Sequence, residues 1–197
     1  MAGAYSYRSD PARMTVQRRG ALYPRLLGIA WNRLPVEIRE MHQGAGKALG
    51  RATVERGTGT LARLVALVLR LPKAAADTPI SVQFDVCGGS ETWTRSFGDE
   101  QFSSRQFAGH GRWAGLLCEQ FGPLTFAMTL GPEGGRLSLA LRHWKAFAIP
   151  LPLWLGPRAI AYETAEAGRF RFHVEISHPL TGLIVRYRGW LVRSPPS

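Results

Sequence analysis

The C-terminal two-thirds of the chain alternates apolar and polar residues with a period of two. In the clearest run, RFRFHVEIS (169–177), every second residue from Phe170 onward is apolar. Similar runs begin at Ile80, Leu124 and Leu137, and glycine-rich turns recur between them. Such alternation is typical of an antiparallel sheet with one buried face. We therefore predict a meander of about eight or nine strands that is strongly curved or closed into a barrel.

The segment before this sheet has helical spacing instead. Apolar residues within 22–30 recur at helical intervals, and Pro35 suits the first turn of a second short helix. A third helix is expected over 60–71, because Pro72 would stop it. A short strand is expected over 51–56. The predicted fold class is α+β, with N-terminal helices packed on a strongly curved antiparallel β-sheet or calycin-like barrel.

The chain divides into a short tail and one domain. Residues 1–20 are predicted to be a basic flexible tail, and residues 21–193 a single α+β domain. One connection in this domain, AIPLPLWLGP (148–157), is apolar and rich in proline, so it cannot pair as a central strand. A lid, an exposed partner surface and a buried crossover all stay open for this segment.

Four polar residues occupy positions where the strand pattern calls for apolar ones. They are Arg95, Glu119, His143 and Tyr187. If these faces point into a barrel, the four side chains converge on an apolar cavity, which is the usual make-up of a small-molecule site. A buried charge needs a partner, and Arg95 and Glu119 could pair with each other. The alternative is that these residues sit at strand ends or form a structural ion pair.

The sequence Gly57-Thr-Gly59-Thr-Leu-Ala62 fits a dinucleotide-binding motif. The strand before it, however, reads RATVERG (51–57), which is too polar for a central parallel strand, and hairpins follow it. We therefore predict a turn with Thr60 as a helix cap and no dinucleotide cofactor. An anion at this helix N-terminus beside Arg56 is left open.

Motifs for catalysis and metal binding are weak. The sequence has no C-x-x-C, H-E-x-x-H or G-x-S-x-G pattern, so no metal and no cofactor are predicted. Cys118 lies in an apolar segment and is expected to be a buried, inert thiol. The one acid–base pair that the pattern offers is His143 with Glu119, and it requires the two side chains to lie within hydrogen-bond reach.

The formal net charge is +11, and arginine supplies 22 of the 25 cations. The arginines are scattered and accompany no nucleic-acid-binding motif, so we predict no nucleic-acid partner. Weak peripheral contact with anionic lipid headgroups stays open. No apolar run approaches the roughly 20 residues of a transmembrane helix, and no secretory signal is visible, so a cytoplasmic protein is expected.

Several motifs in order resemble the bacterial domain-of-unknown-function family 4166. They are LYPRLLG (22–28), VERGTGTLARLVALVLRLP (54–72), WTRSFG (93–98), FGPLTF (121–126) and GRFRFHVEISHPLTGLIVRYRGWL (168–191). The resemblance implies a bacterial domain found alone or after a saccharopine-dehydrogenase-like NAD-binding region. It implies no catalytic residues.

Three functional hypotheses follow from these observations. The leading one is a non-catalytic binder of a hydrophobic or lipid-like small molecule, with Arg95 facing an anionic head group and Tyr187 and His143 orienting it. The second is an accessory domain that interacts with an NAD-dependent dehydrogenase-like protein, partly through residues 148–157. The third is an enzyme that uses His143 and Glu119 as an acid–base pair.

Overall fold

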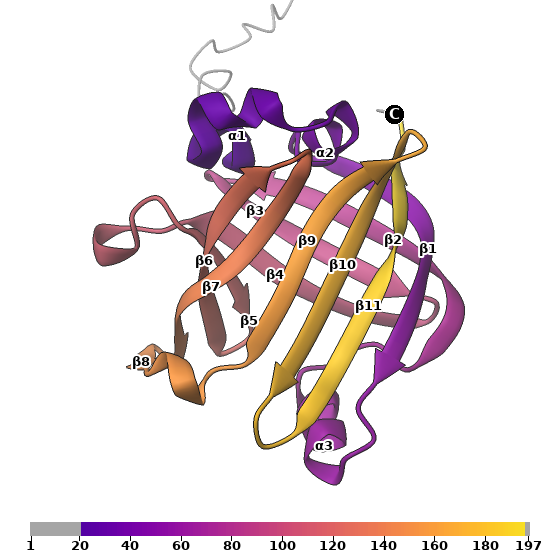
Figure 1. Cartoon of the computed structure of the whole chain (residues 1–197), viewed down its shortest axis with the longest axis vertical. Coiled ribbons are helices and arrows are strands. Elements are labelled where there is room, and N and C mark those ends of the chain that lie inside the picture. Colours follow the sequence, from indigo (N-terminus) through magenta and orange to yellow (C-terminus); the bar gives the residue numbers. More distant parts are fainter. Residues whose placement is uncertain (1–20, 196–197) are drawn as a thin grey trace, which may run out of the picture.

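The computed structural model describes residues 21–195, and in this part of the chain ten antiparallel strands close into a barrel (Figure 1). An eleventh, short strand lies at its edge. The predicted α+β class and calycin-like barrel are therefore confirmed, although there are more strands than expected. The predicted basic tail, residues 1–20, lies outside the described residues.

The strands are β1 Gly46–Arg56, β2 Ala75–Cys87, β3 Ser90–Phe97, β4 Glu100–Ala108, β5 Leu117–Phe121, β6 Leu124–Glu133, β7 Arg136–Ala146, β8 Ile149–Leu151, β9 Arg158–Glu166, β10 Arg169–His178 and β11 Gly182–Arg193. The α-helices are α1 Leu22–Leu27, α2 Val36–Met41 and α3 Thr60–Val68. Short 3-10 helices are η2 Gly28–Arg33, η3 Gly111–Trp113 and η4 Leu153–Leu155.

Most neighbours in the barrel are also neighbours in the sequence. Strands β1 to β6 pair in order, β1 pairs with β11, and β11 continues through β10 to β9. The ring closes at β7, which pairs along its length with β6 but with β9 only over Leu137–Leu139. Beyond that short contact β7 and β9 separate, and β8 pairs with the far end of β7. The wall is therefore weakly joined along one seam.

The inner face of the wall follows the apolar register. In β2, Ile80, Val82 and Phe84 are almost inaccessible to solvent, whereas Gln83 and Asp85 between and beside them are exposed. A side-chain period of two sends alternate residues to opposite faces of a strand. This alternation explains why the apolar runs of the sequence became the barrel interior.

The N-terminal helices cover one end of the barrel (Figure 1). Ile38 and Met41 of α2 and Tyr23 of α1 point into that end and are buried. Arg193, near the end of β11, donates hydrogen bonds to four backbone carbonyls at and after the C-terminus of α2, those of Glu40, Met41, Gly44 and Ala45. Because the last carbonyls of a helix lack partners within it, this arginine ties the cap to the barrel.

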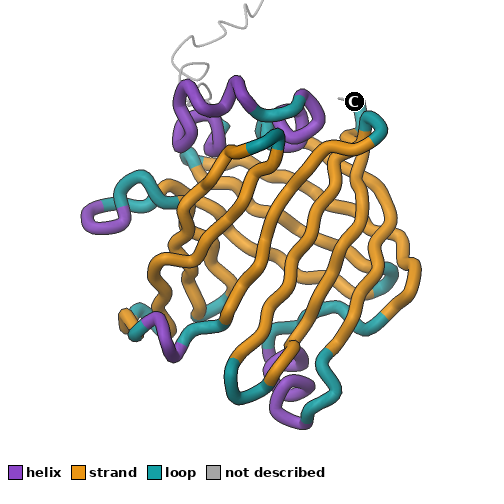
Figure 2. Tube along the Cα trace, viewed as in Figure 1, coloured by secondary structure: helices purple, strands orange, loops and turns teal. Residues whose placement is uncertain are grey.

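Helix α3 lies at the other end, with β8, η4 and the β10–β11 turn (Figures 1 and 2). The strand before α3 is antiparallel to both neighbours, which excludes a dinucleotide-binding βαβ unit. Gly57 is needed for packing, because a Cβ there would lie 1.7 Å from the carbonyl oxygen of Leu183. The helix is capped by Gly59 without a side-chain hydrogen bond, so the prediction that Thr60 caps it is wrong.

Candidate functional site

The barrel contains a cavity of about 460 Å³ with a mostly apolar wall. Side chains from many strands line it, among them Val82, Met128, Leu139, Phe172 and Val174. Its size falls within the roughly 300–1,000 Å³ range of small-molecule sites. A site of this kind has to be formed by residues spread over the whole sheet, because each strand contributes only its inward positions.

Three of the four predicted site residues line this cavity: Arg95 on β3, Glu119 on β5 and Tyr187 on β11. Arg95 and Glu119 form an ion pair with Arg95 Nη2 3.1 Å from Glu119 Oε1, so the predicted pairing of these residues is confirmed. Both side chains are only 11% exposed. Their placement inside the barrel is as predicted, and their role in ligand binding stays a prediction.

The Glu119 carboxylate is the centre of a hydrogen-bond network. Its Oε1 accepts from Ser104 Oγ at 2.6 Å and from Gln106 Nε2 at 3.2 Å, in addition to Arg95. Arg95 also donates from Nη1 to Ser104 Oγ at 2.8 Å, and its guanidinium lies over the Trp93 ring. Both terminal nitrogens of Arg95 therefore already have acceptors, and the pair carries no net charge.

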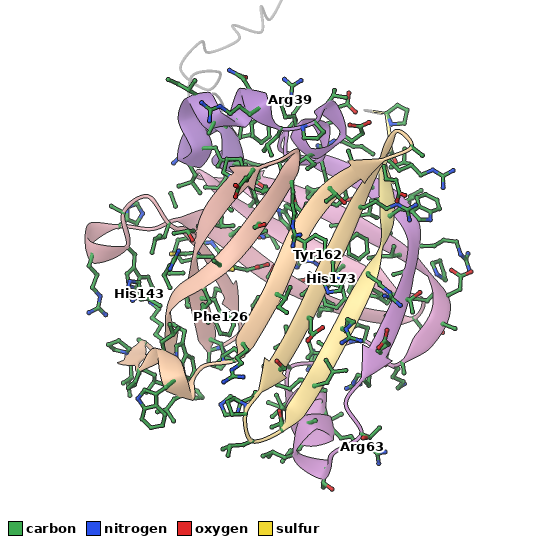
Figure 3. All side chains as sticks on the ribbon, viewed as in Figure 1. Arg39, Arg63, Phe126, His143, Tyr162 and His173 are labelled. Atoms are coloured by element: carbon green, nitrogen blue, oxygen red, sulfur yellow. The ribbon has the colours of Figure 1, made fainter. Side chains whose placement is uncertain are left out.

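His143 does not join this group, so the prediction that it faces the interior is wrong. The β6–β7 register pairs Ala127 with His143 but Met128 with Leu141, which leaves Arg142 as an extra, bulged residue. A bulge shifts the alternation by one position. His143 is therefore exposed on the outside of the wall (Figure 3). Its ring stacks on that of Trp113, with 6.2 Å between the ring centroids.

The residue after His143 takes its place inside. Trp144 lines the cavity and donates from Nε1 to the carbonyl oxygen of Pro152 at 2.9 Å. His143 and Glu119 thus lie on opposite faces of the wall, and the predicted acid–base pair cannot form.

Cys118, next to Glu119, is buried, and burial raises the pKa of its thiol, so it is held in the un-ionised, poorly nucleophilic form.

Sequence reasoning missed a second polar group at the capped end of the barrel. The Tyr23 hydroxyl donates to Gln106 Oε1 at 3.1 Å, and Gln106 in turn donates to Glu119. His42, whose ring stacks on Tyr23, lies with Nε2 2.6 Å from Oε2 of Glu163 on β9. Gln106 could have been found, because it shares an inward face with Phe102. The other contacts join distant segments and leave no periodic signal.

Burial also sets the ionisation of the cavity phenols. Burial raises the pKa of Tyr187 to about 12, and the nearby Glu119 carboxylate adds to the rise. Burial, followed by the charge of Glu163, raises the pKa of Tyr23 well above its usual value. Both hydroxyls are therefore neutral near pH 7 and can donate hydrogen bonds. Within residues 21–195, no group of three His, Cys, Asp or Glu side chains is arranged to hold a metal ion.

A family model described as "Domain of unknown function (DUF4166)" matches residues 34–191. The chain belongs to the DUF4166 family. This confirms the resemblance seen in the sequence motifs. The partnership of DUF4166 domains with dehydrogenase regions stays a prediction. No curated protein matches this DUF4166 chain at a significant level.

Three solved structures are similar to this DUF4166 barrel at low sequence identity. One is described as the REP1-NXSQ fatty acid transporter, with 12% identity, a TM-score of 0.37, and coverage of 78% of this chain and 97% of that one. Rv2717c from M. tuberculosis has 11% identity, a TM-score of 0.45, and coverage of 82% and 99%. Zebrafish ileal bile acid-binding protein complexed with cholic acid has 14% identity, a TM-score of 0.36, and coverage of 75% and 98%.

Proposed function

We propose that this DUF4166 domain binds a hydrophobic small molecule inside the barrel and does not transform it. The observation that supports this proposal is the cavity of about 460 Å³, whose wall is mostly apolar. Burying a ligand's apolar surface there would supply most of the binding free energy. The Arg95–Glu119 network is a small polar area on that wall.

The polar network favours a ligand with an uncharged polar group, such as an alcohol, an amide or an ester. The charge of Arg95 is balanced by the Glu119 carboxylate, with which it forms an ion pair. An anionic head group would have to compete with Glu119 for the same guanidinium and would meet a second carboxylate, Glu163. The neutral hydroxyl of Tyr187 remains a suitable hydrogen-bonding group, whereas the amide of Gln106 is already engaged by Tyr23 and Glu119. This replaces the anionic head group that the sequence first indicated for Arg95.

The test is ligand binding to the delipidated protein, followed by the fluorescence of Nile red, an uncharged dye that brightens in apolar surroundings. Ala161 lines the cavity, whereas Ile160 beside it on β9 faces outward and is exposed. Ala161→Phe should fill part of the cavity and weaken Nile red binding at least about tenfold, because the ring occupies space in which the apolar surface of the dye would otherwise be buried. Ile160→Phe is the matched control and should bind like the wild type.

A competition experiment tests the polar end of the ligand. Dodecanol should displace Nile red more effectively than dodecanoate, because only the anion is opposed by the carboxylates. Failure of the wild type to bind Nile red, together with an organic extract of the purified protein that contains no lipid, would overturn the proposal. Equal loss of binding in Ala161→Phe and Ile160→Phe would also count against the cavity as the site.

A dehydrogenase-like partner and a cytoplasmic location are two further proposals. Both come from the sequence and from the family resemblance. A pull-down with this domain that retains no NAD-dependent dehydrogenase-like protein would remove the first, and fractionation of the native cells would decide the second.

A further inference from the structure

The end of the barrel opposite α1 and α2 exposes apolar side chains from three separate segments. They belong to residues 61–68 of α3, to residues 147–155 around β8 and η4, and to Leu180 in the β10–β11 turn. We call this set the apolar rim. Leu67 is 72% exposed and Trp154 is 75% exposed. Isolated exposed apolar residues are ordinary, but a cluster gathered at one end of a molecule marks an interaction surface.

Helix α3 contributes a largely apolar surface to the apolar rim. Its sequence, TLARLVALV, has a single charged residue, Arg63 (labelled in Figure 3). Ala62 and Ala66 on its inner side are fully buried, while Leu67 and Val68 on its outer side are exposed. A helix that is apolar all round is normally covered on all sides. Within residues 21–195, nothing covers the outer side of this one.

The apolar rim is continuous with the cavity. Leu61, Leu155 and Leu180 each line the cavity and are also exposed at the surface. A groove on the outside of the wall, between β7 and β9, reaches the same end and is bordered by Trp154. Whatever covers the apolar rim therefore also covers the mouth through which a ligand would enter.

The segments that carry the apolar rim contain more cations than anions. Residues 57–74, 147–158 and 178–182 contain four Lys or Arg residues and no Asp or Glu. Lys73 pairs with Glu100 at the start of β4, whereas Arg63, Arg70 and Arg158 have no ion-pair partner in the described part of the chain. Apolar side chains flanked by cations match the surface of an anionic bilayer, where headgroups meet acyl chains.

We propose that the apolar rim docks on an anionic lipid bilayer, with α3 and residues 147–155 at the boundary between headgroups and acyl chains. In this orientation the cavity mouth faces the membrane, and a hydrophobic ligand passes between bilayer and cavity without crossing water. Docking goes beyond the proposed function, because it needs the apolar rim and not an occupied cavity. Within residues 21–195 no helix is long and apolar enough to span a bilayer, so contact through α3 would be confined to one leaflet.

The test is co-sedimentation with vesicles of phosphatidylcholine and phosphatidylglycerol, compared with vesicles of phosphatidylcholine alone. The wild type should bind the anionic vesicles more tightly. Leu67→Asp and Trp154→Asp should each weaken this binding about tenfold, the factor expected from losing the burial of one large apolar side chain. Ile29→Asp is the matched control, because Ile29 is 85% exposed but lies in η2 at the capped end.

A second readout does not depend on the stability of the aspartate variants. Tryptophan emission should shift to shorter wavelength when anionic vesicles are added to the wild type, and Trp154→Phe should bind equally well with a much smaller shift. Equal weakening in Leu67→Asp, Trp154→Asp and Ile29→Asp would reduce the effect to net charge and overturn the proposal. Absence of vesicle binding would overturn it too, and cross-linking of Trp154 to a protein in that case would point to a protein partner instead.

The two proposals can fail separately. Ala161→Phe, which should lose Nile red, is expected to sediment with anionic vesicles like the wild type. Vesicle binding without Nile red binding would leave docking and remove the ligand site, and the reverse result would leave the ligand site and remove docking.

Discussion

Replacing Glu119 by alanine leaves the guanidinium of Arg95 in the cavity wall without its carboxylate. Each partner is only 11% exposed, and Glu119 Oε1 also accepts hydrogen bonds from Ser104 and Gln106. Removing one member of a buried ion pair costs about 3–5 kcal/mol, because the remaining charge stays desolvated. The open mouth of the cavity admits some water, so we expect a loss of about 3 kcal/mol, near the lower limit.

The double variant Arg95→Met with Glu119→Leu removes both charges together. Apolar replacements for a buried ion pair are often neutral or stabilising, so this variant should unfold within about 1 kcal/mol of the wild type. The single variants Arg95→Met and Glu119→Leu complete a thermodynamic cycle with this double variant. Because the double variant should cost much less than the sum of the two single variants, we expect a coupling energy well above the roughly 0.5 kcal/mol within which independent sites add. In a domain of this size, the loss in Glu119→Ala corresponds to a decrease in Tm of roughly 6–12 °C.

Urea denaturation followed by circular dichroism measures these free energies, provided that the slope with denaturant is the same in all four proteins. A double variant that is as unstable as Glu119→Ala, with additive single effects, would refute the reasoning. It would mean that the two side chains act independently and that water in the cavity solvates each charge. Nile red binding should survive in the double variant, whereas the preference for dodecanol over dodecanoate should shrink.

Three further outcomes test how the barrel is held together. Arg193→Ala should lower the free energy of unfolding by roughly 1.5–3 kcal/mol, the range for hydrogen bonds to a charged group, and should speed up hydrogen exchange in α2. Arg193→Lys should not restore the stability, because an ammonium group cannot replace the planar guanidinium at four carbonyl oxygens. Gly57→Ala should lose more than about 2 kcal/mol in urea denaturation, because its Cβ would lie 1.7 Å from the Leu183 carbonyl oxygen. Gly59→Ala should lose only about 1 kcal/mol or less, because its nearest atom is 3.7 Å away and the change costs only the N-cap preference for Gly over Ala. The pKa of Tyr187 is raised to about 12 in the folded state, so the folded protein holds this proton to higher pH than the unfolded chain does. The contribution of Tyr187 to the free energy of unfolding should therefore be complete below pH 10 and be lost as the pH rises towards 12. Tyr187→Phe should remove a phenolate absorbance change in that pH range.

The alternation of apolar residues was enough to determine the wall of the barrel. It predicted antiparallel strands, and it placed Arg95, Glu119 and Tyr187 on the inner face. The polar strand before Gly57 and the hairpins after it argued against a dinucleotide-binding βαβ unit, and the structure shows antiparallel pairing on both sides of that strand. These inferences succeeded because side-chain direction in a regular strand is a local property with a fixed period.

Tertiary structure alone decided the features that break this period or join distant segments. One bulged residue, Arg142, turned His143 outward and Trp144 inward, and such an insertion cannot be read from alternation. The contact of His42 with Glu163 spans 121 positions, so it became visible only when α2 closed the end of the barrel. Which apolar side chains stay exposed was equally undetermined, because Leu67 and Ala66 are both apolar and only packing buries one and leaves the other in water.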